Sequence, residues 1–284
     1  MRTHRKTNRL TGALRGRLSL AVMTLLGVTT VASCAISRQQ ELALGQQYAA
    51  QLDAELPLIE DATAVRYINT LGTSIARHGE RGLSYTFKLV NSDVVNAFAV
   101  PGGYVYVNRG LVERADNMSE LAGVVAHEIA HVEERHSAEQ IGRVQGANVG
   151  LTLAYVLLGR GPGGLERTAI NVGGGLVLAG YSRDAEEEAD AVAVPLLVSA
   201  GIDPDGLVTF FQKLIDDQKR SPSALEQWFS THPTTADRIE NTRERIASLP
   251  RAQMRNLASE SSEFDAFQSR LRSMPPAPKT ASRD

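Results

Sequence analysis

The pattern of apolar positions predicts a chain that is mainly helical. Between residues 36 and 76, apolar side chains recur at spacings of three and four, which indicates two amphipathic helices interrupted at Pro57. Residues 118–135 and 185–199 continue the helical pattern. Further helices are predicted at 206–219, 236–249 and 264–271. The expected fold class is α+β, mainly α.

Short strands are expected only between residues 84 and 108. Residues 85–90 alternate in part, and the runs 94–100 and 104–107 are separated by the turn Pro101-Gly102-Gly103. We expect a small antiparallel sheet with residues 94–99 at its edge. Such an edge can hydrogen-bond an extended peptide backbone. A purely structural hairpin is the alternative, and the pattern alone does not decide between them.

Charge and cysteine content exclude some classes of protein. The chain has 30 Lys and Arg against 32 Asp and Glu, a net charge of −2, with both signs dispersed. Because it lacks a basic stripe, nucleic acid is not an expected partner. The single cysteine rules out an intramolecular disulfide.

The N-terminus is typical of an export signal. A basic start precedes the apolar stretch 18–31 and the small residues before Cys34. We therefore predict a signal peptide over residues 1–33. A retained signal anchor is the alternative, although the stretch is short for a helix that must span about twenty residues.

Cys34 refines this prediction. The run Val31-Ala32-Ser33-Cys34 resembles a bacterial lipobox, which implies cleavage before Cys34 and lipid attachment to it. By resemblance to Gram-negative sorting signals, Ala35 at the next position favours the outer membrane. The expected product is a periplasm-facing, lipid-anchored protein with one folded domain at 34–272. Residues 273–284, which are rich in proline and polar side chains, are expected to be disordered.

Candidate chemistry is concentrated in His127-Glu128-Ile129-Ala130-His131. On a helix, residues four apart share a face, so the two imidazoles can hold one zinc ion with Glu128 beside them as a general base. A catalytic zinc needs a third protein ligand. The extended motif that would supply a third histidine is absent, because His136 is one residue out of its register.

The best source of a third ligand is an acidic segment about fifty residues downstream. Glu186 and Asp190 are four apart, so Glu186 can bind the metal while Asp190 accepts a hydrogen bond from a ligating histidine. A solvated acidic helix face is the alternative, and it describes the neighbouring Glu187 and Glu188 better.

These landmarks together resemble the M48 peptidases, which include CAAX-processing and HtpX-type proteases. The resemblance rests on the histidine motif, on Ser182-Arg183-x-x-Glu186-x-x-Ala189-Asp190, on the segment 96–103, and on Thr231-His232-Pro233 followed by Arg238. It implies a zincin-like fold with the small sheet beside the metal helix. It further implies one zinc per chain, polypeptide substrates, Glu128 as base, and the ligands His127, His131 and Glu186. It also favours a substrate-binding edge at Asn96, Ala97, Phe98 and Ala99.

His232 has three possible roles. It could donate a hydrogen bond to the oxyanion of the reaction, with Tyr181 and Arg183, both expected near the ligands, as weaker candidates. It could instead occupy the fourth metal position and keep the enzyme inactive. The third possibility is a loop histidine that caps a helix.

We expect the chain to be a zinc endopeptidase that cleaves misfolded or misassembled envelope proteins. The envelope assembly machinery is a possible partner. One alternative is a non-proteolytic chaperone or assembly factor that keeps zinc for structure, but an intact Glu128 argues against it. Another is a hydrolase of a non-peptide bond, for which a backbone-aligning strand has no use.

Overall fold

The computed structural model describes residues 36–143 and 180–278, which belong to the compact unit Ile36–Asp284. The predicted signal peptide, Cys34 and the last six residues of the predicted tail lie outside the described residues. Within the part that is described, no helix is both long enough and apolar enough to cross a membrane.

The two predicted N-terminal helices are α2 (Arg38–Glu55) and α3 (Ala62–Ala76). The side chain of Ser37 accepts a hydrogen bond from the backbone of Gln40, whose side chain accepts one from Ser37 in return. Asp61 caps α3 through the backbone N–H of Ala64. Capping side chains satisfy N–H groups that the first helical turn leaves free, which fixes where each helix begins.

The sheet contains β1 (Thr86–Val90), β2 (Ala97–Val100) and β3 (Tyr104–Asn108), in the order β1-β3-β2. The fold class α+β is confirmed, and β2 lies at an edge of the described sheet as expected. The sheet is mixed, however, and not wholly antiparallel as predicted. The strand β3 lies between the other two, so β1 pairs with it in parallel and β2 pairs with it antiparallel. Residue alternation identifies strands but carries no information about which strands become neighbours.

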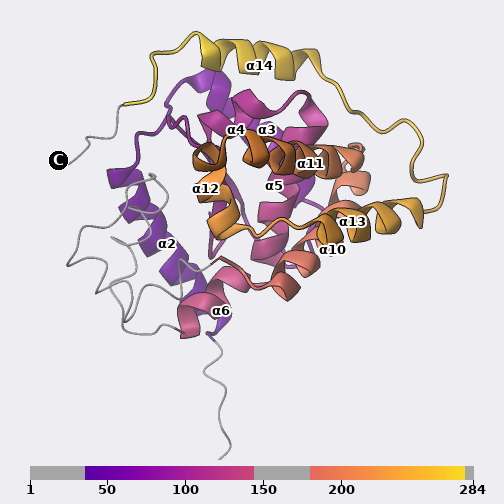
Figure 1. The fold of residues 1–284 in the computed structure, drawn as a ribbon. Coiled ribbons are helices and arrows are strands. Elements are labelled where there is room, and N and C mark those ends of the chain that lie inside the picture. The colour runs from indigo at the N-terminus through magenta and orange to yellow at the C-terminus, as the bar shows by residue number, and fades with distance from the viewer. Residues whose placement is uncertain (1–35, 144–179, 279–284) are drawn as a thin grey trace, which may run out of the picture. The chain divides into compact units, whose positions relative to one another are not determined.

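The helix α5 (Met118–Glu133) carries the histidine motif and lies near the middle of the helices in Figure 1. The N-cap Asn117 accepts a hydrogen bond from the backbone of Glu120. The bounds of these helices are α4 (Arg109–Arg114), α5 (Met118–Glu133), α6 (His136–Arg143), α10 (Arg183–Ser199), α11 (Asp205–Arg220), α12 (Pro222–Thr231), α13 (Ala236–Ala247) and α14 (Ser262–Arg272).

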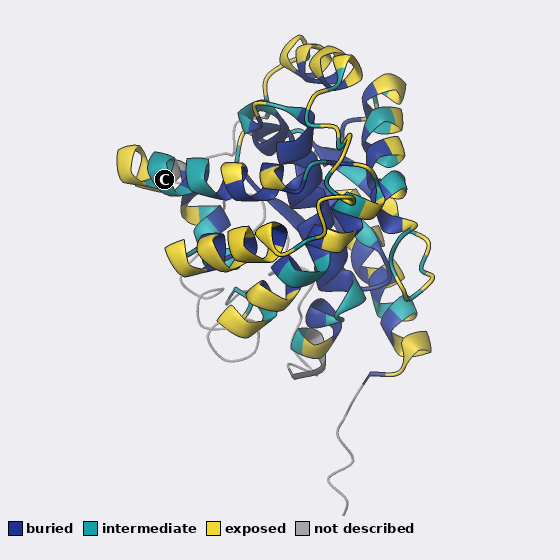
Figure 2. Ribbon diagram, turned by 90° about the vertical axis from the view of Figure 1, so that its right-hand side faces the viewer, coloured by how far each residue is buried: buried dark blue, intermediate teal, exposed yellow. Residues whose placement is uncertain are grey.

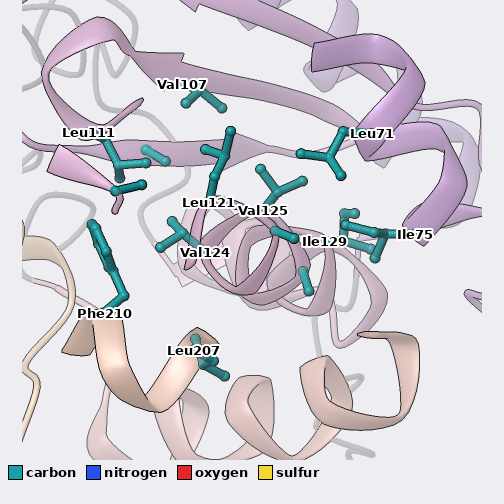
Figure 3. Close-up of a cluster of buried hydrophobic side chains, with 14 of the residues drawn as sticks. Leu71, Ile75, Val107, Leu111, Leu121, Val124, Val125, Ile129, Leu207 and Phe210 are labelled. Atoms are coloured by element: carbon teal, nitrogen blue, oxygen red, sulfur yellow. The ribbon is translucent and has the colours of Figure 1, made fainter. Parts of the chain in front are cut away.

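The helix α5 is buried on every side. All of its residues from Met118 to Val132 are buried, whereas the outer faces of peripheral helices are exposed (Figure 2). In Figure 3 its side chains Val125 and Ile129 lie among apolar side chains from α3, β3 and α11. A helix that is apolar nearly all round belongs in a core. Its polar residues are therefore held in a dry environment.

Two glycines allow α5 and α11 to approach closely. A Cβ placed on Gly123 would lie 2.7 Å from the Cα of Leu207, and a Cβ on Gly206 would lie 2.3 Å from the carbonyl carbon of Ser119. Backbone atoms cannot yield as a flexible side chain can. Neither helix can therefore accept a methyl group at the crossing without moving.

We expect Gly123→Ala to lower the free energy of unfolding by about 1–3 kcal/mol, because the added methyl group overpacks the crossing. Helix propensity alone would give the opposite sign, a gain of up to about 1 kcal/mol. Thermal and urea unfolding measure the difference. Ala43→Gly, at an exposed position of α2, reports propensity by itself. Stabilisation by Gly123→Ala would show that the helices can separate at no cost.

Candidate metal site

Four buried side chains from three segments converge on one point. His127 and His131 come from α5, Glu186 from the first turn of α10, and His232 from the C-cap of α12. One ligand atom from each lies within 4.8 Å of all the others. His127, His131 and Glu186 are fully buried, and His232 is 1% exposed.

The distances suit a tetrahedral ion. Nε2 of His127 and Nε2 of His131 are 3.0 Å apart. The oxygens of Glu186 lie 3.5 Å from Nε2 of His127 and 3.4 Å from Nε2 of His131. Ligands about 2.0–2.1 Å from zinc are separated by about 3.3–3.4 Å in a tetrahedron. Imidazoles with one carboxylate are also a donor set that zinc prefers.

Glu128 lies beside this cluster and is fully buried. Within the described part of the chain, neither of its carboxylate oxygens has a side-chain hydrogen-bond partner. Nε2 of His232 lies 3.4 Å from Oε1 of Glu128, and the backbone N–H of Ala99 is directed at the carboxylate. Burial raises the pKa of Glu128. A buried carboxylate of this kind is suited to accept a proton from a water molecule placed between it and a metal ion.

Behind the ligands lies a network of buried charges. Nδ1 of His127 is 2.9 Å from Oδ1 of Asp190, on the same face of α10 as Glu186. The guanidinium of Arg238, from α13, donates two hydrogen bonds of 2.8 Å to Asp190 and one of 2.5 Å to Glu186. Arg238 is 1% exposed. It therefore pairs with both buried carboxylates at once and fixes their orientation.

The local field sets which of these groups are charged. Burial raises the pKa of Glu186, but His232 and hydrogen bonds from the ligand histidines outweigh it and hold that pKa well below its ordinary value. Burial also raises the pKa of Asp190, and His127 and Arg238 reverse the effect. Both carboxylates are thus anionic at neutral pH, as a metal site requires.

The two ligand histidines differ from each other. Burial holds the pKa of His131 well below its ordinary value, so its ring is neutral. Burial also acts to lower the pKa of His127, but Asp190 and Glu186 raise it to about 9. In the absence of metal, His127 therefore carries a proton that a bound cation would displace.

The predicted substrate segment lies against the site. The strand β2 is buried along its whole length, and Asn96 just before it is buried with no hydrogen-bond partner for its amide among the described residues. The carbonyl of Ala99 accepts a hydrogen bond of 3.1 Å from Ser137, whose hydroxyl is also 2.7 Å from that of Tyr181.

One predicted residue is not brought to the site. Arg183 is exposed at the start of α10, and no contact between described residues joins it to the ligands. Tyr181, two residues earlier, instead stacks on His131 with ring centroids 3.8 Å apart. The charge role of Arg238 was not predicted, although the residue stands in the quoted motif. A buried arginine is recognisable only once its two carboxylate partners are known to meet.

Comparisons with known proteins agree with this geometry. The chain is 34% identical over 249 residues to the beta-barrel assembly-enhancing protease of Escherichia coli (strain K12), an alignment that covers 84% of this chain and 50% of that protein. It is 31% identical over 181 residues to metalloprotease LoiP of the same organism, covering 63% of this chain and 68% of that protein. It is 32% identical over 186 residues to mitochondrial metalloendopeptidase OMA1 of Schizosaccharomyces pombe (strain 972 / ATCC 24843), covering 66% of this chain and 53% of that protein.

The chain spans about half the length of the beta-barrel assembly-enhancing protease that it matches. The sequence pattern of Peptidase family M48 matches residues 59–246, well over half of the chain. This range begins before the sheet and contains all four residues of the buried cluster. The resemblance noted in the sequence is confirmed: this chain belongs to peptidase family M48.

Proposed function

We propose that the chain is a zinc-dependent endopeptidase with His127, His131 and Glu186 as metal ligands and Glu128 as general base. The observation that carries the proposal is the convergence of buried ligand atoms within 4.8 Å of one another beside a buried carboxylate whose oxygens make no side-chain hydrogen bond among the described residues. A structural zinc site is closed by four ligands and has no use for such a base.

The side chains around the cluster divide the work of hydrolysis. Zinc, when bound, polarises the scissile carbonyl and makes the attacking water more acidic. Glu128 takes the proton of that water and passes it to the leaving nitrogen. Asp190 and Arg238 hold the ligands in place from behind. The edge of β2 aligns the substrate backbone, for which Ser137 has to release the carbonyl of Ala99.

We propose envelope proteins, misfolded or misassembled, as the substrates. Support comes from the similarity to the beta-barrel assembly-enhancing protease of Escherichia coli and from the export signal expected at residues 1–33. Envelope assembly machinery is then a possible partner. Because this chain spans about half of that relative, its substrates and partners need their own test.

We also propose that Cys34 carries lipid and anchors the chain to a bacterial membrane, facing the periplasm and in the outer membrane. The support is the sequence alone, an apolar stretch followed by Val31-Ala32-Ser33-Cys34 with Ala35 after it. Ile36, only two residues beyond Cys34, is already buried in the folded unit. An anchor at Cys34 would therefore hold the catalytic unit close to the lipid surface.

His232 is proposed to be a resting latch. Its Nδ1 lies 3.1 Å from Glu186 and its Nε2 lies 3.4 Å from Glu128, so the ring is placed between a ligand and the base. A ring in that position occupies space that water and the substrate carbonyl need. The oxyanion role remains the competing proposal, because the same ring could donate a hydrogen bond once it swings aside.

Glu128→Gln should lower casein cleavage by the purified full-length protein about 100- to 10,000-fold, because the amide cannot accept the proton. Zinc content should stay near one per chain, since Glu128 is not a ligand. Proteolysis and metal analysis on the same samples measure both. A non-proteolytic assembly factor would behave differently, because its cellular phenotype would survive the substitution. Unchanged cleavage would exclude Glu128 as the base.

His232→Ala should raise basal cleavage, by about ten- to a hundredfold if the latched state is 90–99% populated. Initial rates on casein, at equal zinc occupancy, give the change. The oxyanion role requires the opposite result, a fall of about a hundredfold or more. Thr231→Ala, next to the histidine and on the same helix, is the control for local disturbance.

Cys34→Ser should release the chain from the membrane fraction and abolish labelling by radioactive palmitate. The serine cannot form the thioether through which the lipid is attached. Fractionation of cells that produce each variant separates inner from outer membrane. An unaltered chain that is found in the membrane fraction and carries no label would instead have a retained signal anchor.

A further inference from the structure

His136 folds back over the end of the helix that carries the proposed ligands. Arg135, between α5 and α6, has φ of 64°, a left-handed conformation that ends α5 and starts α6 at the next residue. Nε of Arg135 is 2.9 Å from Oε2 of Glu41, which is itself buried, and its guanidinium contacts the carbonyl of Ile36. The change of chain direction at Arg135 is thus held in place by Glu41 of α2 and by the backbone at Ile36. It puts His136, which is 8% exposed, beside His131.

Two successive contacts connect His131 to the protein surface through His136. Its Nδ1 lies 2.9 Å from Nδ1 of His136, and Nε2 of His136 lies 3.2 Å from Oε2 of Glu188. The ring of Tyr181 stacks on His131 at an interplanar angle of 18°. One partner thus meets the edge of the His131 ring and another covers its face.

The direction of the hydrogen bonds follows from the ligand cluster. Nε2 of His131 faces His127 and Glu186, so this nitrogen offers its lone pair to a cation. The proton of the neutral ring then belongs on Nδ1, which donates to Nδ1 of His136. His136 in turn carries its own proton on Nε2 and donates to Glu188. Each donor has one acceptor, and this series of hydrogen bonds ends at the carboxylate of Glu188, whose side chain is 58% exposed.

We propose that His136 is a positioning residue for His131, and that Glu188 orients His136 in turn. The inference rests on the proposed metal site. Metal-binding histidines usually donate their second N–H to a carboxylate or carbonyl, which fixes the ring and makes it a better ligand. His127 meets Asp190 directly, at 2.9 Å. His131 reaches its carboxylate through a second imidazole, so the two ligands are supported by different means.

The opposing interpretation is that His136 only fills space between α6 and α10. Substitutions that change the hydrogen bond at nearly constant burial separate the two. His136→Leu fills the site and removes the acceptor. His136→Asn keeps an acceptor, because its amide oxygen takes the place of Nδ1. Both are compared with the unaltered full-length protein, stripped of metal and titrated with zinc against a chromophoric chelator.

We expect zinc to bind His136→Leu about 10- to 100-fold more weakly, the usual effect of losing such a support. His136→Asn should recover most of the affinity and stay within about threefold of the unaltered protein, since it keeps the acceptor. Thermal unfolding of the metal-free proteins should give similar midpoints. If His136 only fills space, the two variants should differ in the midpoint of thermal unfolding. Loss of the acceptor in His136→Leu should then leave the zinc affinity unchanged.

A second pair of variants tests the carboxylate and does not disturb the core. Glu188→Gln weakens the acceptor for His136, and Glu187→Gln makes the same change at the neighbouring exposed position of α10. We expect a loss of zinc affinity of about three- to tenfold for Glu188→Gln, at the low end for an outer support, and none for Glu187→Gln.

The outcomes separate this inference from the proposed function. If the unaltered protein binds no zinc, the proposed function fails. If it binds zinc and His136→Leu binds equally well, the positioning role is overturned while the metal site stands. If His136→Leu does not fold, the two exposed glutamates decide, and equal zinc affinities for Glu188→Gln and Glu187→Gln overturn the proposal.

Discussion

The structure depends on the placement of carboxyl side chains in a dry interior. Glu186 and Asp190 are buried on one face of α10, and Glu128 is buried on α5. Each buried ion costs several kcal/mol in lost hydration unless it is well paired. Arg238 supplies that pairing for two of the three carboxylates. The helices α5, α10 and α13 are therefore joined by charge as well as by apolar packing.

Among the described residues, Glu128 has no guanidinium partner of this kind, and its closest basic group is His232, 3.4 Å from Oε1. A fold selected for stability alone would replace Glu128, because a buried carboxylate with few hydrogen bonds is destabilising. Glu128 is present next to four potential ligands, and titratable groups with perturbed pKa values gather at functional sites. The tight crossing of α5 with α11 at Gly123 and Gly206 then supplies the rigid support that such a site needs.

Much of this arrangement could be predicted from local pattern. Apolar spacing located most of the helices, although not α4, α6 or α12. The pairs His127 with His131 and Glu186 with Asp190 share faces simply because residues four apart do so. The parts that could not be predicted depend on contacts between distant segments. The pairing of β1 with β3 and the burial of Arg238 between two carboxylates both require the chain to fold back. The contact of His136 with His131 is local, but it depends on the left-handed Arg135, a conformation that arginine seldom adopts.

The strand order has a consequence for folding. Within the described sheet, β1 and β2 pair only with β3, the last of the three along the chain. The hairpin of β2 and β3 can close early, because its loop is short. The first strand must wait for that hairpin and then dock in parallel, a non-local step that is intrinsically slower. Until β3 is in place, the segment 86–90 can contact only what precedes it in the chain, the bridge between Leu58 and Val90 and the side chain of Asn69.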